Sequence, residues 1–213
     1  MTVQINYKSN NSKKVSSNLV LFVDEKFNIN SLKKHISNSE FSYIADLLKT
    51  SDLKKDLLLF KINSKKTIFL ASIKKDLKTS DIENLGAKFH GYIDYDKKSD
   101  YVVNSDTINS KIRNFVGYFL HGLKLKSYEF NIYKSKKNKK LVSVNVIGNK
   151  NKISSKDQLR FKALEEGTFF ARDLVSEPGN ILHPDEYAKR INSLRKFGLK
   201  INIYDEKKLK KLG

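Results

Sequence analysis

The sequence contains no cysteine, and that absence excludes several kinds of chemistry. Disulfide frameworks, thiolate metal sites and cysteine nucleophiles all need this side chain, so a metal bound to this chain would require histidine or carboxylate ligands. Long apolar runs are also missing, because the longest ones, such as Leu57–Phe60, are far shorter than the roughly 20 residues of a membrane span. We therefore expect no segment that crosses a membrane.

The N-terminal residues show none of the features of a secretory signal. Met1–Asn6 has no basic stretch, no apolar stretch and no small-residue cleavage site. A cytoplasmic location is therefore the expectation. The length of 213 residues allows one good-sized domain and part of another, because domains cluster near roughly 100–150 residues.

Lysine dominates the charge of the chain. The sequence has 42 Lys and Arg residues against 23 Asp and Glu residues, which gives a formal net charge of +19. Clustered basic side chains bind nucleic acids by neutralising phosphates. Here the lysines are spread along the whole chain, and their densest run covers only residues 134–140. This pattern favours a solvated surface, with weak DNA binding as the alternative.

The first half of the sequence alternates short strand-like runs with amphipathic stretches, which is typical of a sheet covered by helices. Strands are expected at residues 3–7, 18–23, 56–62, 67–73 and 141–147. The polar spacer Asn63–Lys66 predicts a hairpin between two of them, and residues 31–48 predict a helix or an irregular connection. The predicted fold class is therefore α/β.

Two further helices are predicted before the last of these strands. The first runs from Ser80 to about Tyr95, with Ser80 as its N-cap and Glu83 completing a capping box, although Gly86 and Gly91 weaken the helical pattern. The second begins at Ser105 or Asp106. Its apolar face, at spacings of three and four residues, is made by Ile108, Ile112, Phe115, Val116, Phe119, Leu120 and Leu123.

A long helix and the beginning of a second α/β pattern follow. Ser154 or Ser155 can cap a helix that runs to about Val175, and Pro178-Gly179 ends it. The elements expected after it are a helix from Pro184, a strand at 199–204 and a short helix at 206–212. Together these elements predict an N-terminal accessory α/β domain at 1–150, a connector helix at 151–178 and the start of a further domain at 179–213. Because the last strand would have no neighbour to pair with, we expect a truncated chain.

The common motifs that carry chemistry are absent from the sequence. There is no phosphate-binding glycine loop, no H-E-x-x-H and no G-x-S-x-G. The four histidines, at 35, 90, 121 and 183, lie too far apart to form a helical metal pair. His121 falls near the buried face of its helix and is expected to be a hydrogen-bonded structural residue. The sequence therefore predicts no catalytic residue and no metal ligand.

Three stretches nevertheless resemble one enzyme family. Residues 163–187 closely resemble the segment E-G-x-x-x-A-R-D-L-V-N-x-P-x-N-x-x-x-P of leucyl (cytosol) aminopeptidases, with Ser176 and Gly179 where that family usually has Asn and Ala. Residues 125–137 are similar to its S-Y-x-F-x-x-Y-K-x-K-K stretch, and residues 205–213 match its D-E-x-x-L-x-x-L-G. Order and spacing agree over about half of the chain.

The resemblance implies a macro-like N-terminal domain, in which helices flank a mixed sheet, followed by a connector helix and the truncated start of an α/β catalytic domain. It also implies a homo-hexameric exopeptidase that removes N-terminal residues from peptides with two divalent ions, Mn or Zn. The family's ligand segments, of the types G-K-G-x-x-x-D and N-T-D-A-E-G-R, are absent here. This fragment is therefore expected to bind no metal and to be inactive by itself.

The family motif in residues 163–187 is assigned a structural role under this resemblance. Its residues are Arg172, Asp173, Pro178, Asn180 and Pro184. Two other interpretations stay open. The chain could be a nucleic-acid or nucleotide-type binding module that acts through its basic surface, or a structural fragment whose unpaired strand docks on a partner.

Overall fold

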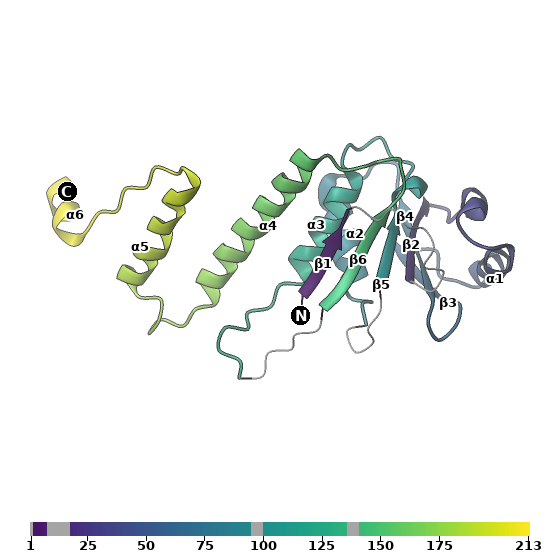
Figure 1. The fold of residues 1–213 in the computed structure, drawn as a ribbon, viewed down its shortest axis with the longest axis horizontal. Helices are drawn as coiled ribbons and strands as arrows, with labels where there is room; N and C mark the ends of the chain where they lie inside the picture. The colour runs from purple at the N-terminus through teal and green to yellow at the C-terminus, as the bar shows by residue number, and fades with distance from the viewer. Residues whose placement is uncertain (1, 8–17, 95–99, 136–140) are drawn as a thin grey trace. The chain divides into compact units, whose positions relative to one another are not determined.

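A sheet of six strands organises the first part of the chain (Figure 1). This computed structural model describes residues 2–7, 18–94, 100–135 and 141–213. The strands are β1 (Thr2–Asn6), β2 (Asn18–Asp24), β3 (Leu57–Lys61), β4 (Thr67–Ile73), β5 (Asp100–Asn104) and β6 (Leu141–Ile147). They lie in the order β1-β6-β5-β2-β4-β3, and each neighbouring pair is parallel except β3 and β4. The predicted strands and the predicted hairpin between β3 and β4 are confirmed.

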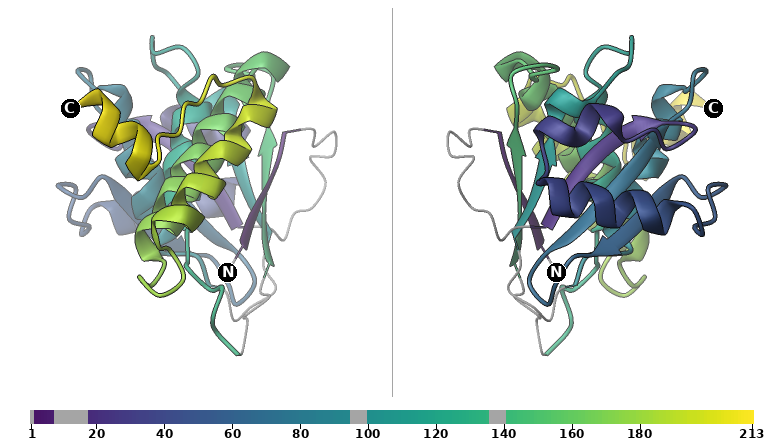
Figure 2. Two further views of the ribbon diagram at one scale, coloured as in Figure 1. Left: turned by 90° about the vertical axis from the view of Figure 1, so that its left-hand side faces the viewer. Right: turned by 90° about the vertical axis from the view of Figure 1, so that its right-hand side faces the viewer.

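Helices cover both faces of this sheet. The 3-10 helix η1 (Asn30–Lys34) and α1 (Asn38–Leu48) pack on one face, whereas α2 (Thr79–His90) and α3 (Phe115–Lys126) pack on the other. The right-hand view of Figure 2 shows η1 and α1, in dark blue, in front of the strands that they cover. A mixed sheet between helices confirms the predicted α/β fold class.

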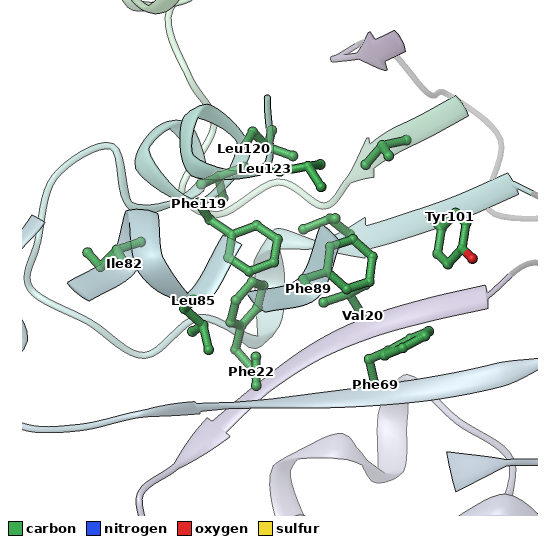
Figure 3. Close-up of a cluster of buried hydrophobic side chains, with 14 of the residues drawn as sticks. Val20, Phe22, Phe69, Ile82, Leu85, Phe89, Tyr101, Phe119, Leu120 and Leu123 are labelled. Atoms are coloured by element: carbon green, nitrogen blue, oxygen red, sulfur yellow. The ribbon is translucent and has the colours of Figure 1, made fainter. Parts of the chain in front are cut away.

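The central strand β2 divides the hydrophobic core into two clusters. Val20 and Phe22 belong to the cluster that contains α2 and α3, whereas Leu21 and Val23 belong to the cluster that contains α1. Successive side chains of a strand point to opposite faces, so a strand covered on both sides is apolar throughout. Figure 3 shows the first cluster, in which the rings of Phe22 and Phe119 meet edge to face with their centroids 5.3 Å apart.

Glycines bring α2 and α3 close together. A Cβ atom at Gly86 would lie 1.8 Å from the carbonyl oxygen of Phe119, and one at Gly122 would lie 1.9 Å from the carbonyl oxygen of Glu83. Any side chain at either position would therefore force the two helices apart. Gly86, which weakens the helical pattern in the sequence, is therefore a contact point between α2 and α3 in the fold.

The predicted N-cap of α2, Ser80, is wrong. The helix begins at Thr79, and Lys78 occupies the N-cap position. The carboxylate of Asp81 accepts a hydrogen bond from the backbone N–H of Lys78 at 2.8 Å. Glu83, which the sequence placed in a capping box, instead lies two residues beyond Asp81 and is hydrogen-bonded to His121 of α3 at 2.8 Å.

The predicted start of α3 is wrong by about three turns, because the helix begins at Phe115. Residues 105–107 form only the short 3-10 helix η2 (Ser105–Thr107). Local hydrogen bonds favour that turn, since the side chain of Asn104 accepts from the N–H of Asp106 and Thr107 donates to the carbonyl of Asn104. Asn114, with φ of 60°, is left-handed and separates this segment from α3.

The chain divides into two compact units, residues 1–166 and 167–213. The helix α4 (Ser155–Ser176) includes the division, and Ser154 caps it as predicted, accepting a hydrogen bond from the N–H of Asp157 at 3.1 Å. The second unit continues with α5 (Pro184–Asn192), the 3-10 helix η3 (Ser193–Phe197) and α6 (Glu206–Leu212).

The strand predicted at residues 199–204 is wrong, since this segment forms no regular secondary structure. A strand needs a neighbour for its backbone groups, and none of the described residues provides one there. The predicted domain boundaries at 150 and 178 stay a prediction. Across the described residues, no helix has the length and apolar character needed to cross a bilayer.

Candidate functional site

The residues of the predicted family motif lie at the end of α4 and at the start of α5. Arg172 and Asp173 are half-buried on the last turns of α4, whereas Pro178 and Asn180 are exposed in the turn that follows. The carbonyl of Pro178 accepts hydrogen bonds from two N–H groups three and four residues further on, each at 2.9 Å. Pro184 begins α5 as predicted, where its missing N–H costs no helical hydrogen bond.

Ion pairs fasten α5 to the end of α4 within the second unit. The guanidinium of Arg190 donates from Nη1 to Glu177 at 2.8 Å and from Nε to Glu186 at 3.0 Å. The Glu177 side chain is only 2% exposed. The hydrogen bonds that Arg190 donates to Glu177 and then to Glu186 raise the pKa of Arg190, and the bond from Arg190 in turn lowers the pKa of Glu186. The sequence contains the four-residue spacing of Glu186 and Arg190, but nothing in it identifies Glu177 as the second partner.

The first half of α4 packs against α3 within the first unit. The ring of Phe161 lies edge to face against Tyr118, with centroids 5.1 Å apart, and a Cβ atom at Gly117 would lie 2.1 Å from it. Lys124 donates to Glu165 at 3.1 Å and to the carbonyl of Val3 at 2.8 Å, which joins α3, α4 and β1. These contacts hold the two helices and the edge strand together.

His121 is a structural residue, as predicted. Its Nδ1 is hydrogen-bonded to Glu83, and its ring lies against Phe161 with centroids 5.6 Å apart. The side chain is only 8% exposed. His35 is hydrogen-bonded through Nδ1 to the side chain of Asn104 at 3.1 Å. Burial, followed by the nearby charge of Lys34, lowers the pKa of His35, so its ring is neutral at pH 7.

The described residues do not fit a metal centre. No group of three or more histidine, aspartate or glutamate side chains converges in residues 2–7, 18–94, 100–135 and 141–213.

The lysine-rich run at 134–140 lies largely outside these ranges, so its predicted solvent exposure is not described.

Two crevices share the loop between β4 and α2. The larger, of about 1050 Å³, contains Asp56, which pairs with Lys74 at 2.7 Å and also with Lys88. The hydrogen bonds from Lys74 and then Lys88 lower the pKa of Asp56. The smaller crevice, of about 770 Å³, lies at the carboxyl ends of β2 and β4. The sequence predicts neither crevice, because the residues that line each one come from segments far apart in the chain.

Comparison with known proteins shows which proteins this chain resembles in sequence and in fold. No protein-family model matches the chain. A probable cytosol aminopeptidase of Agrobacterium fabrum is 40% identical over 101 residues, which are 45% of this chain and 20% of that protein. The aligned part thus spans about a fifth of the length of this relative. The chain is related to the cytosol aminopeptidases, and the resemblance predicted from its motifs is confirmed.

Solved structures share the fold. A mutant of tomato leucine aminopeptidase superposes with a TM-score of 0.71 at 16% identity, covering 99% of this chain and 46% of that one. The bottromycin maturation enzyme BotP, solved in complex with Mn, superposes with a TM-score of 0.64 at 14% identity, covering 93% of this chain and 40% of that one. These likenesses confirm that the six-stranded sheet with its flanking helices is the N-terminal fold of leucine aminopeptidase structures.

Proposed function

We propose that this chain is the N-terminal part of a metal-dependent leucyl aminopeptidase, which removes N-terminal residues from peptides by two-metal hydrolysis. The observation that carries the proposal is the 40% identity to a cytosol aminopeptidase over 101 residues. The presence of Mn in the structure of BotP supports metal dependence. When two ions are bound in the parent protein, they activate a water and polarise the scissile carbonyl.

The catalytic groups and metal ligands lie outside residues 1–213 under this proposal. The proposal follows from the sequence, which contains neither the G-K-G-x-x-x-D type of segment nor the N-T-D-A-E-G-R segment that supplies the ligands in the resembled family. Residues 1–150 then form the accessory domain, 151–178 the connector helix and 179–213 the beginning of the catalytic domain. Arg172, Asp173, Pro178, Asn180 and Pro184 shape the end of the connector and the entry into α5. The parent protein would work as a homo-hexamer in the cytoplasm.

The test compares the parent protein with residues 1–213 alone. We expect the parent to hydrolyse leucyl-p-nitroanilide with Mn²⁺ or Zn²⁺ and to lose that activity in EDTA. Residues 1–213, at the same concentration and with the same metals, should release no product. Hydrolysis by residues 1–213 would place the catalytic groups inside this chain, and an inactive parent with either metal would contradict the peptidase assignment. Sedimentation of the parent tests the hexamer separately.

A further inference from the structure

A network of hydrogen bonds around η2 joins the end of β5 to the segment between β6 and α4. Asp106 of η2 accepts, through Oδ1, hydrogen bonds from the backbone N–H groups of Asn149 and Lys150, at 2.8 and 2.7 Å. The hydroxyl of Ser105 donates to the carbonyl of Lys150 at 2.6 Å. Since residues 148–151 follow β6 and lead to α4, η2 fastens the beginning of this connection to the sheet.

One amide side chain determines how η2 itself is held. Asn104, the last residue of β5, is only 5% exposed. Its Oδ1 accepts a hydrogen bond from the backbone N–H of Asp106 at 3.0 Å, and its backbone carbonyl accepts one from the hydroxyl of Thr107 at 2.8 Å. Because only the oxygen of an amide side chain can accept from an N–H, these contacts fix which way the Asn104 amide is turned.

The nitrogen of the Asn104 amide faces His35, the residue that follows η1. Nδ2 of Asn104 lies 3.1 Å from Nδ1 of the imidazole ring. Nδ2 can only donate, so Nδ1 must accept, and the proton of the neutral ring is on Nε2. Among the described residues, no group is hydrogen-bonded to the buried Nε2. The network therefore requires a neutral His35.

The surrounding charges also bear on the ring. The charged groups that act on His35 are Lys34, next to it in the chain, and Asp106 of η2, which in turn interacts with Lys150. Burial, followed by Lys34, lowers the pKa of His35 against the opposing effect of Asp106. The hydrogen bonds from the N–H groups of Lys150 and Asn149 lower the pKa of Asp106, so its carboxylate stays charged at pH 5.

Protonation of His35 is incompatible with this network. A proton on Nδ1 would face the N–H of Asn104 Nδ2, donor against donor. If the Asn104 amide turned over to present its oxygen to the ring, its nitrogen would face the N–H of Asp106 instead. In both arrangements, Asn104 loses one of its two side-chain hydrogen bonds.

We propose that His35 and Asn104 form a pH-sensitive latch, which holds η2 and residues 148–151 at neutral pH and releases them when the ring is protonated. The unfolded ring titrates near pH 6.5, and the pKa of the folded ring is lower. The stabilising effect of the latch is therefore complete above about pH 6.5 and is lost as pH falls toward the folded pKa. This inference does not depend on the proposed peptidase function.

Amide hydrogen exchange of the 213-residue chain, followed by NMR, tests the latch. Rates are divided by those of an unstructured chain at the same pH, which removes the intrinsic effect of pH. Between pH 7 and pH 5, the protection of the N–H groups of Asp106, Asn149 and Lys150 should fall about tenfold, the equivalent of one hydrogen bond. The protection of β2 and β4 should stay the same. Unchanged protection at the three N–H groups, or an equal fall throughout the sheet, would overturn the proposal.

A matched pair of variants identifies the group that titrates. His35→Gln keeps a hydrogen-bond acceptor but cannot be protonated, so its three N–H groups should be equally protected at pH 5 and pH 7. His90→Gln is the control, because burial also lowers the pKa of His90, whereas this residue lies in α2. It should lose protection at pH 5 as the parent does. Loss of protection in His35→Gln as large as in the parent would refute the latch.

Asn104→Asp gives a readout that a purely structural role would not move. Its carboxylate can accept both from the N–H of Asp106 and from Nδ1–H of a protonated His35. The NMR titration midpoint of His35 should therefore move from below about pH 6.5 in the parent to above it in the variant. The three N–H groups should then stay protected at pH 5. An unchanged midpoint would show that Nδ1 is not held as an acceptor by Asn104, and the latch would be wrong.

Discussion

Residues 1–166 and residues 167–213 hold their structure in different ways. The first unit buries two hydrophobic clusters, one on each face of its sheet. In the second unit, α5, η3 and α6 bury no residue, and Val175, Phe197 and Leu212 are 87%, 68% and 71% exposed. The first unit is therefore stabilised by a core, and the second by local hydrogen bonds and ion pairs.

The difference shows how far local signals can define structure without a core. In the second unit, Asp205 caps α6 by accepting from the N–H of Lys208 at 2.8 Å, and Arg190 joins α5 to Glu177. Helices shorter than about 12–15 residues are marginal in isolation, because nucleation is costly. We therefore expect the second unit to open far more readily than the first.

The largest expected effect contrasts one phenylalanine from each unit. Phe22→Ala should lower the free energy of unfolding by about 3–5 kcal/mol, because it removes a fully buried ring and leaves a cavity. Phe197→Ala should change it by less than about 0.5 kcal/mol, because that ring is mostly exposed. Urea unfolding followed by circular dichroism measures both. Similar losses in the two variants would break the comparison.

Two glycines inside helices provide the next contrast. Gly122→Ala should destabilise the first unit by about 1–3 kcal/mol, because its Cβ would overlap the carbonyl of Glu83. Gly167→Ala, in α4, places its Cβ where nothing lies within 4 Å, and should stabilise the helix by about 0.5–1 kcal/mol. The same urea titrations report both. A stabilising Gly122→Ala would show that α2 and α3 are not in close contact.

A largely buried ion pair should make the first unit sensitive to acid. Glu40 pairs with Lys66 at 2.6 Å, and both side chains are 13% exposed. Burial raises the pKa of Glu40, but the hydrogen bonds from Lys66 and Ser37 outweigh it, so the net pKa is lowered. Its stabilising contribution is thus present above the unfolded pKa of about 4.3 and is lost as pH falls through the folded value.

Glu40→Gln removes this contribution. Between pH 6 and pH 3, the unfolding free energy of the variant should fall less steeply than that of the parent. Asp46→Asn serves as the control, because Asp46 pairs with Lys49 on the surface. The Asp46 side chain is 77% exposed and that of Lys49 is 75% exposed, so this pair contributes little to stability. Identical pH profiles for the parent and Glu40→Gln would contradict the role given to this pair.

The smallest expected effect is local to the second unit. Arg190→Met should speed amide hydrogen exchange across residues 184–197, because it releases α5 from Glu177, while the urea midpoint of the first unit stays unchanged. Lys189→Met is the matched control, because Lys189 is 80% exposed and reaches only Glu186, at 3.5 Å. Unchanged amide hydrogen exchange in Arg190→Met would show that the ion pair between Arg190 and Glu177 does not hold α5.

Much of the fold could be predicted from the sequence, because its signals are local. The apolar runs of β2 and β4 and the polar spacer at 63–66 identified strands and a hairpin directly. The start of α3 could not be found in this way, because Ile108 has helical spacing yet is buried in a non-helical segment. Periodicity reports which side chains are buried, and it does not distinguish a helix from a turn that packs the same residues.

The family motif and the crevices also differ in whether local sequence signals reveal them. The motif residues from Arg172 to Pro184 were located by resemblance, since they are contiguous in sequence. The sequence does not predict the smaller crevice, because Asp24 ends β2 whereas Lys75 and Lys111 belong to two loops far along the chain, and only the strand order brings them together. No spacing along the chain marks such a site.

The sequence by itself determined the α/β class, most strands, the cap of α4, and the resemblance to the aminopeptidases, because each is carried by residues within a few positions of one another. Tertiary structure decided the order of the strands, the glycine contact between α2 and α3, the partner of Glu177 and the crevice at the strand ends. These features depend on which distant segments meet, and that outcome is set by burying both faces of one sheet.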